Sequence, residues 1–315
     1  MKLSEKLVDP YTRVLIFGLP GSGKSTLAAD LAKTHNLIWI TLDNDADILR
    51  KLDKESQDRI NLVDIPDSAS FPVAAATLLP LFKNKKAVIC WEHGVIQCAV
   101  CKKKAPTEFT SVDFTSLTSK DIVVVDTVTQ LGRSILAHAT KDKPIEYRPE
   151  RDDWGAVRKW TEFFASEFQA SRFNLICISQ AIEAELEDGR VKLVPDFGSK
   201  GMSAGFAKSF SHVIFTETLN KKHKAYSSST HANNVLTKSR TDFRIEDENV
   251  ASLASLFPID TTIPVQKEVQ SKDEIASKEP ETTKESFSYS TQDIPSPAEN
   301  AASSLKLRLA ALKGK

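Results

Sequence analysis

The sequence has few cysteines, no excess of charge of either sign and no long hydrophobic run, and each absence excludes a class of protein. Four cysteines in 315 residues are too few for a disulfide framework, which favours a reducing cytoplasm. The 42 basic residues are matched by 42 acidic ones, which excludes binding of nucleic acid by bulk positive charge. No stretch approaches the roughly 18 apolar residues of a membrane span, and the N-terminus has no apolar signal-peptide core. We therefore expect neither membrane insertion nor secretion.

Over the first 260 residues, short β-branched runs alternate with longer helical patterns, as they do in βαβ units. The runs are almost continuously apolar, which is typical of strands that are covered on both faces. The sequence therefore predicts one α/β domain over residues 1–260, with a mostly parallel sheet. The expected strands are residues 14–17, 37–42, 61–65, 87–90, 122–125, 174–179 and 212–216, and the expected helices are residues 24–33, 71–82, 128–139 and 154–170.

The later part of the chain changes in character. Residues 182–186 and 190–194 flank a Glu-Asp-Gly turn, and a second hairpin pattern over 213–237 has its turn at 221–224, so we expect late antiparallel strands. Residues 261–303 are rich in Ser, Thr, Pro, Glu and Lys, which predicts a disordered linker. Residues 304–315 place leucines on one helical face among basic charges, either as a docking peptide or as a frayed end.

A phosphate-binding loop is the clearest motif. The segment GLPGSGKST at residues 18–26 matches G-x-x-x-x-G-K-[ST] in full, directly after an expected strand and at the start of an expected helix. Glycines allow the backbone N–H groups to curl around phosphate oxygens, and the lysine reaches the β- and γ-phosphates. The pattern predicts binding of a nucleoside triphosphate such as ATP. The expected binding residues are Gly18, Gly21, Ser22, Gly23, Lys24, Ser25 and Thr26.

A second motif supplies a carboxylate. Residues 121–126, DIVVVD, form an apolar strand that ends in Asp126 and is followed by a hydroxyl residue, which is the pattern of a Walker B element. Carboxylate and hydroxyl oxygens are ligands that Mg²⁺ prefers, so we expect Ser25 and Asp126 to hold Mg²⁺ from two sides.

Three of the four cysteines and one histidine are clustered within twelve residues. Cys90, His93, Cys98 and Cys101 have the spacing C-x₂-H-x₄-C-x₂-C, and thiolate and imidazole ligands suit a tetrahedral structural Zn²⁺. The alternatives are three free thiols, or a Cys90 that belongs to the core and leaves the metal with three ligands. The cluster opens an insertion at about residues 90–118, and the lysines at 102–104 either contact DNA phosphates or form a solvated face.

Four segments together resemble the RecA-like recombinases. Residues 121–131 (DIVVVDTVTQL) resemble their Walker B strand and the following helix, and residues 38–43, 175–180 and 235–240 resemble three further strands in the same order. The resemblance spans roughly residues 12–257. It looks closest to the compact phage-type RecA-like ATPases that act in single-strand annealing and recombination.

The resemblance implies roles for individual residues. It makes Asp43 the water-activating acid, although the family usually has glutamate there, so Asp45 is the alternative, and helix capping by these acids is another. It makes Gln180 the sensor of the γ-phosphate, although an exposed polar residue at a strand end is the alternative. It makes Lys238 and Arg240 cations that reach the nucleotide of a neighbouring subunit, unless they are ordinary edge-strand charges.

The same resemblance places DNA-binding loops within residues 183–211, where Phe197 or Phe206 would stack on bases. The sequence thus predicts an ATP- and Mg²⁺-dependent RecA-like ATPase that forms a homo-oligomer on single-stranded DNA. Its C-terminal tail would then dock a replication or recombination partner. A small-molecule or nucleotide kinase is one alternative, and a zinc-containing DNA-binding scaffold that uses ATP as a switch is another. A helicase is a third.

Overall fold

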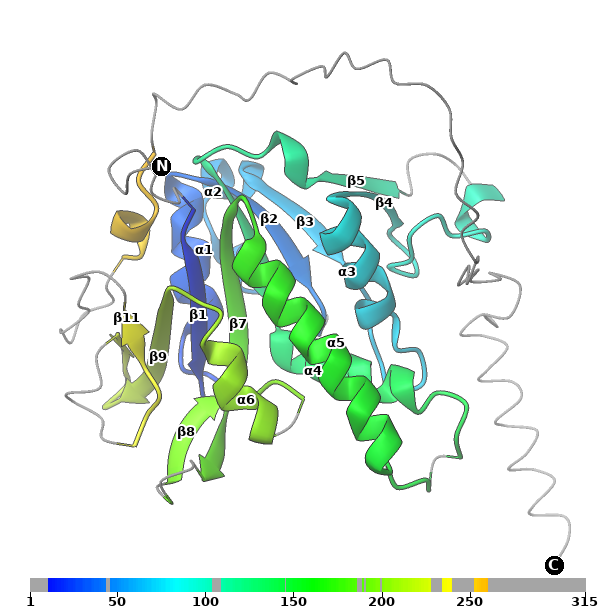
Figure 1. Ribbon diagram of the computed structural model, residues 1–315. Helices are drawn as coiled ribbons and strands as arrows, with labels where there is room; N and C mark the ends of the chain where they lie inside the picture. Colours follow the sequence, from blue (N-terminus) through cyan, green and yellow to red (C-terminus); the bar gives the residue numbers. More distant parts are fainter. Residues whose placement is uncertain are drawn as a thin grey trace, which may run out of the picture.

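A central β-sheet with helices on both faces makes up most of the chain (Figure 1). The computed structural model describes residues 11–43, 46–103, 109–144, 146–185, 189, 191–198, 200–227, 234–239 and 252–259. Asp45, Arg240, the linker at 261–303 and the tail at 304–315 lie outside the described residues. Within the described ranges, no helix is both long enough and apolar enough to cross a membrane.

The main sheet contains nine of the described strands. They are β1 (Arg13–Gly18), β2 (Asn36–Thr41), β3 (Ile60–Asp64), β6 (Asp121–Asp126), β7 (Asn174–Glu185), β8 (Val191–Pro195), β9 (His212–Leu219), β10 (Lys222–Tyr226) and β11 (Lys238–Ser239). Their order is β10-β9-β1-β7-β6-β2-β3, with β11 on β9 and β8 on β7. The pairings among β1, β2, β3, β6, β7 and β9 are parallel. Those of β8, β10 and β11 are antiparallel. The expected α/β fold, mostly parallel with late antiparallel strands, is confirmed.

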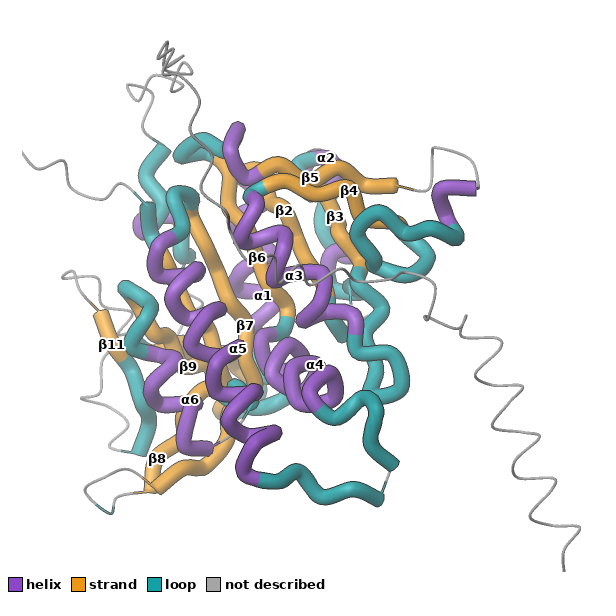
Figure 2. Tube along the Cα trace, turned by 45° about the vertical axis from the view of Figure 1, so that its right-hand side comes forward, coloured by secondary structure: helices purple, strands orange, loops and turns teal. Residues whose placement is uncertain are grey.

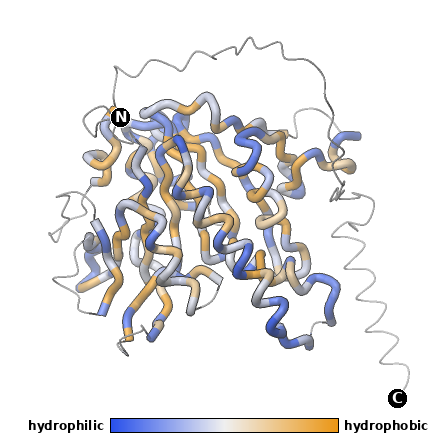
Figure 3. The backbone as a smooth tube through the Cα atoms, in the orientation of Figure 1, coloured by the Kyte–Doolittle hydropathy of each residue, from blue (hydrophilic) through white to orange (hydrophobic). Residues whose placement is uncertain are grey.

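Helices cover both faces of the sheet, as Figure 2 shows. They are α1 (Lys24–Ala29), α2 (Lys54–Asp58), α3 (Val73–Asn84), α4 (Val128–Ala139), α5 (Arg151–Ala170) and α6 (Lys200–Ala207), with 3-10 turns η2 (Asp30–Lys33), η3 (Leu49–Lys51), η4 (Cys101–Lys103), η6 (Phe114–Ser116) and η7 (Ala254–Leu256). Strand side chains alternate between two buried clusters, since Leu15 and Phe17 pack with α3 to α6 whereas Val14 and Ile16 pack with α1. The central strands are accordingly hydrophobic along their length (Figure 3).

Residues 86–103 and 109–116 form a small unit apart from the main sheet. Here β4 (Lys86–Cys90) pairs antiparallel with β5 (Phe109–Asp113) in a separate two-stranded sheet. Figure 1 shows this pair beyond β3, at the opposite end of the sheet from β9. The prediction that residues 87–90 join the main sheet is therefore wrong. The physical reason is that Val88 is exposed while Ile89 is buried, so β4 has one solvated face, unlike a strand covered on both sides.

Two boundaries near the site also differ from expectation. Strand β7 does not end at Gln180 but continues to Glu185, because its parallel pairing with β1 stops at Gln180 and antiparallel pairing with β8 starts at the next residue. The turn between β9 and β10 is shorter than predicted, with Asn220 and Lys221 in the left-handed region and β10 already beginning at Lys222. The β9–β10 hairpin therefore stands beside β1, next to the phosphate-binding loop.

Candidate functional site

The glycine-rich loop connects the end of β1 to the start of α1. Gly21 and Gly23 have φ values of 74° and 87°, in the left-handed region that other residues rarely adopt. At Gly18 the limit is space, since an added Cβ would lie 2.1 Å from the carbonyl oxygen of Thr216 on β9. The three glycines are thus needed for the backbone path and for close packing of the loop against a neighbouring strand.

Strand β9 fixes the loop by two hydrogen bonds. The hydroxyls of Ser22 and Thr216 are 2.8 Å apart, and the Thr218 hydroxyl donates to the Gly21 carbonyl oxygen at 3.1 Å. Because β9 is held by parallel pairing with β1, the loop rests on a rigid support. Such pre-organisation lowers the entropic cost of ordering the loop when a nucleotide binds.

Lys24 points back over the loop and is buried. Its ammonium donates to the carbonyl oxygens of Gly18 and Leu19 at 3.0 and 2.9 Å, and to Oε1 of Gln180 at 3.2 Å. Burial lowers the pKa of Lys24 to about 8, although the carboxylates of Asp126 and Asp43 act in the opposite direction. Burial thus disfavours the charged form of this lysine, and a bound phosphate would stabilise it.

Ser25 and Asp126 meet although they are 101 residues apart. The Ser25 hydroxyl donates to Oδ2 of Asp126 at 3.0 Å. Asp126 ends β6, which is separated from β1 by β7, so the contact depends on the register of three parallel strands. A hydroxyl and a carboxylate in contact are hard oxygen donors, so the pair fits the chemistry of a Mg²⁺ ion.

Asp43 and Gln180 lie at the same cavity, which has a volume of about 370 Å³. Asp43 follows β2, and its Oδ1 is 3.5 Å from the Thr41 hydroxyl. Gln180 lies opposite Gly18 in the β1–β7 register and contacts Lys24. Asp43 and Gln180, the residues that the resemblance assigns to water activation and γ-phosphate sensing, therefore lie at one cavity with residues of the phosphate-binding loop and of the Walker B strand.

His223 is a cavity residue that the sequence did not indicate. It lies on β10, and its ring would be 3.0 Å from a Cβ added at Gly23. Its Nδ1 is 3.1 Å from the Thr218 hydroxyl, whose single hydrogen is donated to Gly21, so Nδ1 carries a proton and donates. Within a lysine-rich expected turn, no local signal distinguishes this histidine. Only the hairpin pairing brings it to the loop.

Lys238 does not line the nucleotide cavity of its own chain. It pairs with Val213 in the first half of β9, and its ammonium donates to the carbonyl oxygens of Lys208 and Phe210 at 2.9 and 2.6 Å. Arg240, its expected companion, and Asp45, the alternative acid, are outside the described residues.

The expected base-stacking role of Phe197 and Phe206 is wrong. Both side chains are buried, and their rings stack on each other with centroids 3.9 Å apart. The glycine-bearing run expected as a loop contains helix α6, and Gly132 of α4 approaches so closely that an added Cβ would lie 2.4 Å from the Gly198 nitrogen. The glycines suggest an open loop, but Phe197 and Phe206 pack in the core beside the close contact between Gly132 and Gly198.

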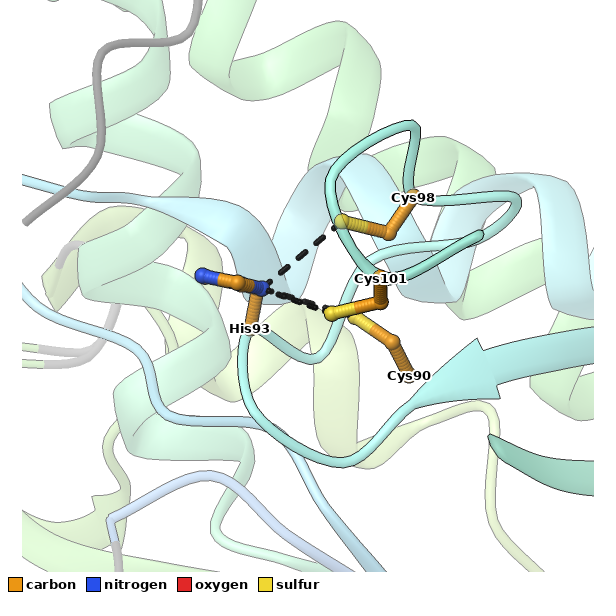
Figure 4. Close-up of side chains that lie close together, drawn as sticks. All are labelled: Cys90, His93, Cys98 and Cys101. Carbon is orange, nitrogen blue, oxygen red and sulfur yellow. Dashed lines mark hydrogen bonds between the residues drawn. The ribbon is translucent and has the colours of Figure 1, made fainter. Parts of the chain in front are cut away.

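The four residues of the expected metal site also converge (Figure 4). Their ligand atoms all lie within 4.8 Å of one another, and all four side chains are buried. Nδ1 of His93 is 3.2 Å from the sulfur of Cys101, 3.7 Å from that of Cys98 and 4.0 Å from that of Cys90. Tetrahedral Zn²⁺ would separate such ligand atoms by about 3.5–3.8 Å. The four residues are therefore a set that could hold a zinc ion.

The surroundings of the cluster are consistent with a metal centre. Burial raises the pKa of Cys101 to about 12, with hydrogen bonding to the neighbouring thiols adding to the effect, so a cation is the group that would favour the thiolate form. The second ring nitrogen of His93 faces a carboxylate oxygen of Glu92 at 3.9 Å. A carboxylate behind a ligating histidine is a common way to orient the ring.

Comparison with known proteins gives a family and distant structural similarity. The chain is similar to the RadB recombinase, with 14% identity and a TM-score of 0.37 over 69% of this chain and 80% of that one. It is also similar to the KaiC-like protein PH0186 from the hyperthermophilic archaeon Pyrococcus horikoshii OT3, with 16% identity and a TM-score of 0.36 over 68% and 76% of the two chains. No curated protein matches the sequence.

The family model described as AAA domain matches residues 11–241. This range contains the phosphate-binding loop, Asp43, Asp126, Gln180 and the four-residue metal cluster. Since the match covers more than half of the chain, the protein belongs to the AAA domain family of P-loop ATPases.

Proposed function

We propose that this ATPase requires Mg²⁺, assembles on single-stranded DNA and promotes annealing or strand exchange. The observation that carries the nucleotide chemistry is the meeting of Lys24 with Gln180 and of Ser25 with Asp126 at one cavity. These contacts join β1, β6 and β7 at the carboxyl ends of parallel strands, where open α/β sheets bind their ligands. The DNA-directed part is supported by the RecA-like resemblance of four segments in order.

The loop and Lys24 would hold the triphosphate. Backbone N–H groups of the glycine-rich loop suit the phosphate oxygens, and the Lys24 ammonium lies where the β- and γ-phosphates would be placed. Bound phosphate would exchange for at least part of the present bonding of Lys24 to carbonyl oxygens and to Gln180. Gln180 would then be released from Lys24 as the γ-phosphate arrives. This exchange gives β7 a means of reporting the nucleotide state to the adjoining hairpin with β8.

The cavity also contains the acids that hydrolysis needs. Ser25 and Asp126 are the residues that would hold Mg²⁺, which when bound neutralises phosphate charge. Asp43 lines the same cavity and would accept a proton from the attacking water. An aspartate reaches less far than the glutamate usual in the family, so we expect slow turnover.

We further propose that ATP binds between subunits of a homo-oligomer, with Lys238 and Arg240 near the interface. Lys238 is fixed by two carbonyl oxygens of its own chain, which leaves Arg240 as the residue proposed to reach the neighbouring nucleotide. Light scattering after size-exclusion chromatography, with and without ATP, tests the assembly. An Arg240→Ala variant that assembles normally but hydrolyses ATP at the wild-type rate would disprove the role of this arginine.

The decisive test of the function is ATP hydrolysis with and without single-stranded DNA, beside Lys24→Ala. We expect stimulation by DNA that is lost in the variant. Phosphate transfer that occurs only when a small acceptor is added would identify a kinase instead. Tight ATP binding with DNA binding but no turnover would identify a scaffold that uses ATP as a switch.

We propose in addition that Cys90, His93, Cys98 and Cys101 bind one structural Zn²⁺ per chain. The geometry supports this assignment because the four ligand atoms enclose a space of tetrahedral size (Figure 4). Elemental analysis of protein purified without added metal tests it, with Cys101→Ser expected to lose the ion. Protein that contains no zinc and in which Cys90, Cys98 and Cys101 react as free thiols under native conditions would exclude the site.

A further inference from the structure

The turns that carry the metal ligands also present unusually exposed apolar side chains. Trp91 is 64% exposed, the largest fraction among the described large hydrophobic residues, and Val100 is 50% exposed. Trp91 lies between Cys90 and His93, and Val100 lies between Cys98 and Cys101. Each therefore lies between two of the four clustered side chains, which converge in Figure 4. Since both turns converge on one point, their tips are held by the same centre.

The Trp91 ring is held in place rather than loose. Its indole N–H donates to the Thr110 hydroxyl on β5, and Thr110 pairs with Ile89 in the two-stranded sheet. The polar edge of the ring is thus satisfied, while most of its surface remains in water. A ring that is fixed before binding loses little entropy when a flat group stacks on it.

Two exposed cations follow the last cysteine of the cluster in the chain. Lys102 and Lys103 follow Cys101 directly and are exposed, and neither pairs with a carboxylate in the described part of the chain. Asp113 is paired with Lys86, and Glu92, which follows Trp91 in the chain, faces His93 and the Cys101 thiol. An aromatic ring beside two unpaired cations suits a polyanion with exposed flat rings.

We propose that Trp91, Val100, Lys102 and Lys103 form a knuckle surface that binds single-stranded DNA. An unpaired base would stack on Trp91 with Val100 beside it, and the two lysines would contact phosphates. A duplex would not fit, because its bases are already stacked. The β4–β5 pair beside this surface lies beyond β3, at the opposite end of the sheet from β9 (Figure 1), so the DNA contact would be separate from the nucleotide cavity. This inference rests on the proposed action on single-stranded DNA and the proposed zinc.

The test uses the full-length protein and a fluorescein-labelled oligothymidylate, with anisotropy as the readout and zinc content measured for every variant. We expect Trp91→Ala to weaken binding about tenfold and Trp91→Phe to restore most of it, because stacking needs any aromatic face. The double variant Lys102→Ala/Lys103→Ala should lower the slope of log K against log salt by about 1.4. Lys51→Ala/Lys159→Ala, at two exposed lysines outside the unit, is the matched control and should leave the slope unchanged.

The outcomes separate this inference from the function on which it rests. Wild-type protein that binds no oligothymidylate would overturn both. Normal binding by wild type and by both knuckle variants, with zinc intact, would overturn the inference alone and indicate that the exposed tryptophan serves a protein partner. Loss of binding in Trp91→Ala with unchanged zinc and unchanged DNA-free ATP hydrolysis would support the knuckle surface.

Discussion

The nucleotide cavity and the metal unit are built in opposite ways. The cavity collects residues from the loop after β1, from α1, from the segment after β2 and from β6, β7 and β10, which are scattered over about two hundred residues and meet because of the strand order. The metal cluster takes all four ligands from residues 90–101, beside a sheet of two strands. The cavity rests on two large apolar clusters, whereas among the described residues the cysteines pack against Val95 and Phe109, and the metal unit joins the main core through Ile89 and Val112. A long-range site thus takes its rigidity from the core, whereas turns that carry ligands close together in the chain gain most from a bound metal.

The largest expected effect is the loss of ATP hydrolysis when an acid of the nucleotide cavity is replaced, compared with replacement of an acid in the metal unit. Asp126→Asn keeps the side-chain shape but removes the charge opposite Ser25, so we expect kcat for ATP hydrolysis to fall by about 10²–10³-fold, as when a key electrostatic group is lost. The matched control is Asp113→Asn, which removes the ion-paired acid of β5 in the metal unit. Steady-state phosphate release measures both. Equal losses in the two variants would show that the regions are not independent.

Removing the metal is the converse experiment. Cys98→Ser, or a strong zinc chelator, should increase hydrogen exchange across residues 86–116 and lower the melting temperature by roughly 5 °C, because little apolar contact remains to hold the turns. ATP affinity should change by less than about twofold, since no ligand residue lines the cavity. Cys177→Ala, in the core of β7, is the control that should leave the zinc content unchanged. A parallel loss of ATP affinity would reveal coupling between the regions.

Sequence reasoning succeeded where chemistry is local and failed where pairing decides. The phosphate loop and the C-x₂-H-x₄-C-x₂-C spacing each lie within about twelve residues, so backbone geometry alone limits where their side chains can be. Asp43, Asp126 and Gln180 were found because each follows or ends an apolar run, and the carboxyl ends of parallel strands share one edge.

The remaining features had no local signal. His223 reaches the cavity through the register of an antiparallel hairpin whose turn is shorter than the sequence suggested. Phe197 and Phe206 were expected on a DNA-binding loop, but both side chains pack in the core, beside the close contact between Gly132 and Gly198. The run at 87–90 resembles the buried strands in composition, and only its pairing with β5 sets it apart.

The cavity should respond to pH in a way that the metal unit does not. The pKa of Lys24 is about 8 because burial opposes its charge, and ATP binding favours the protonated form. Affinity for ATP should therefore be greatest below pH 8 and fall about fivefold between pH 8 and 9, approaching tenfold per unit above that. Titration calorimetry across this range measures the change. Lys24→Arg keeps its charge and should bind ATP more weakly with a flat pH profile; a profile like that of the wild type would assign the effect to another group.

The smallest effect concerns the one cavity wall that comes from the late hairpin. The ring of His223 packs beside Gly23 and donates through Nδ1 to Thr218, so its removal leaves the loop in place but opens the cavity on that side. We expect His223→Ala to raise KM for ATP about threefold with little change in kcat, the size of a single modest contact. Lys222→Ala, at the exposed neighbour on β10, is the matched control. An unchanged KM would mean that the nucleotide leaves this wall untouched, and that the hairpin serves only to hold the loop through Thr218.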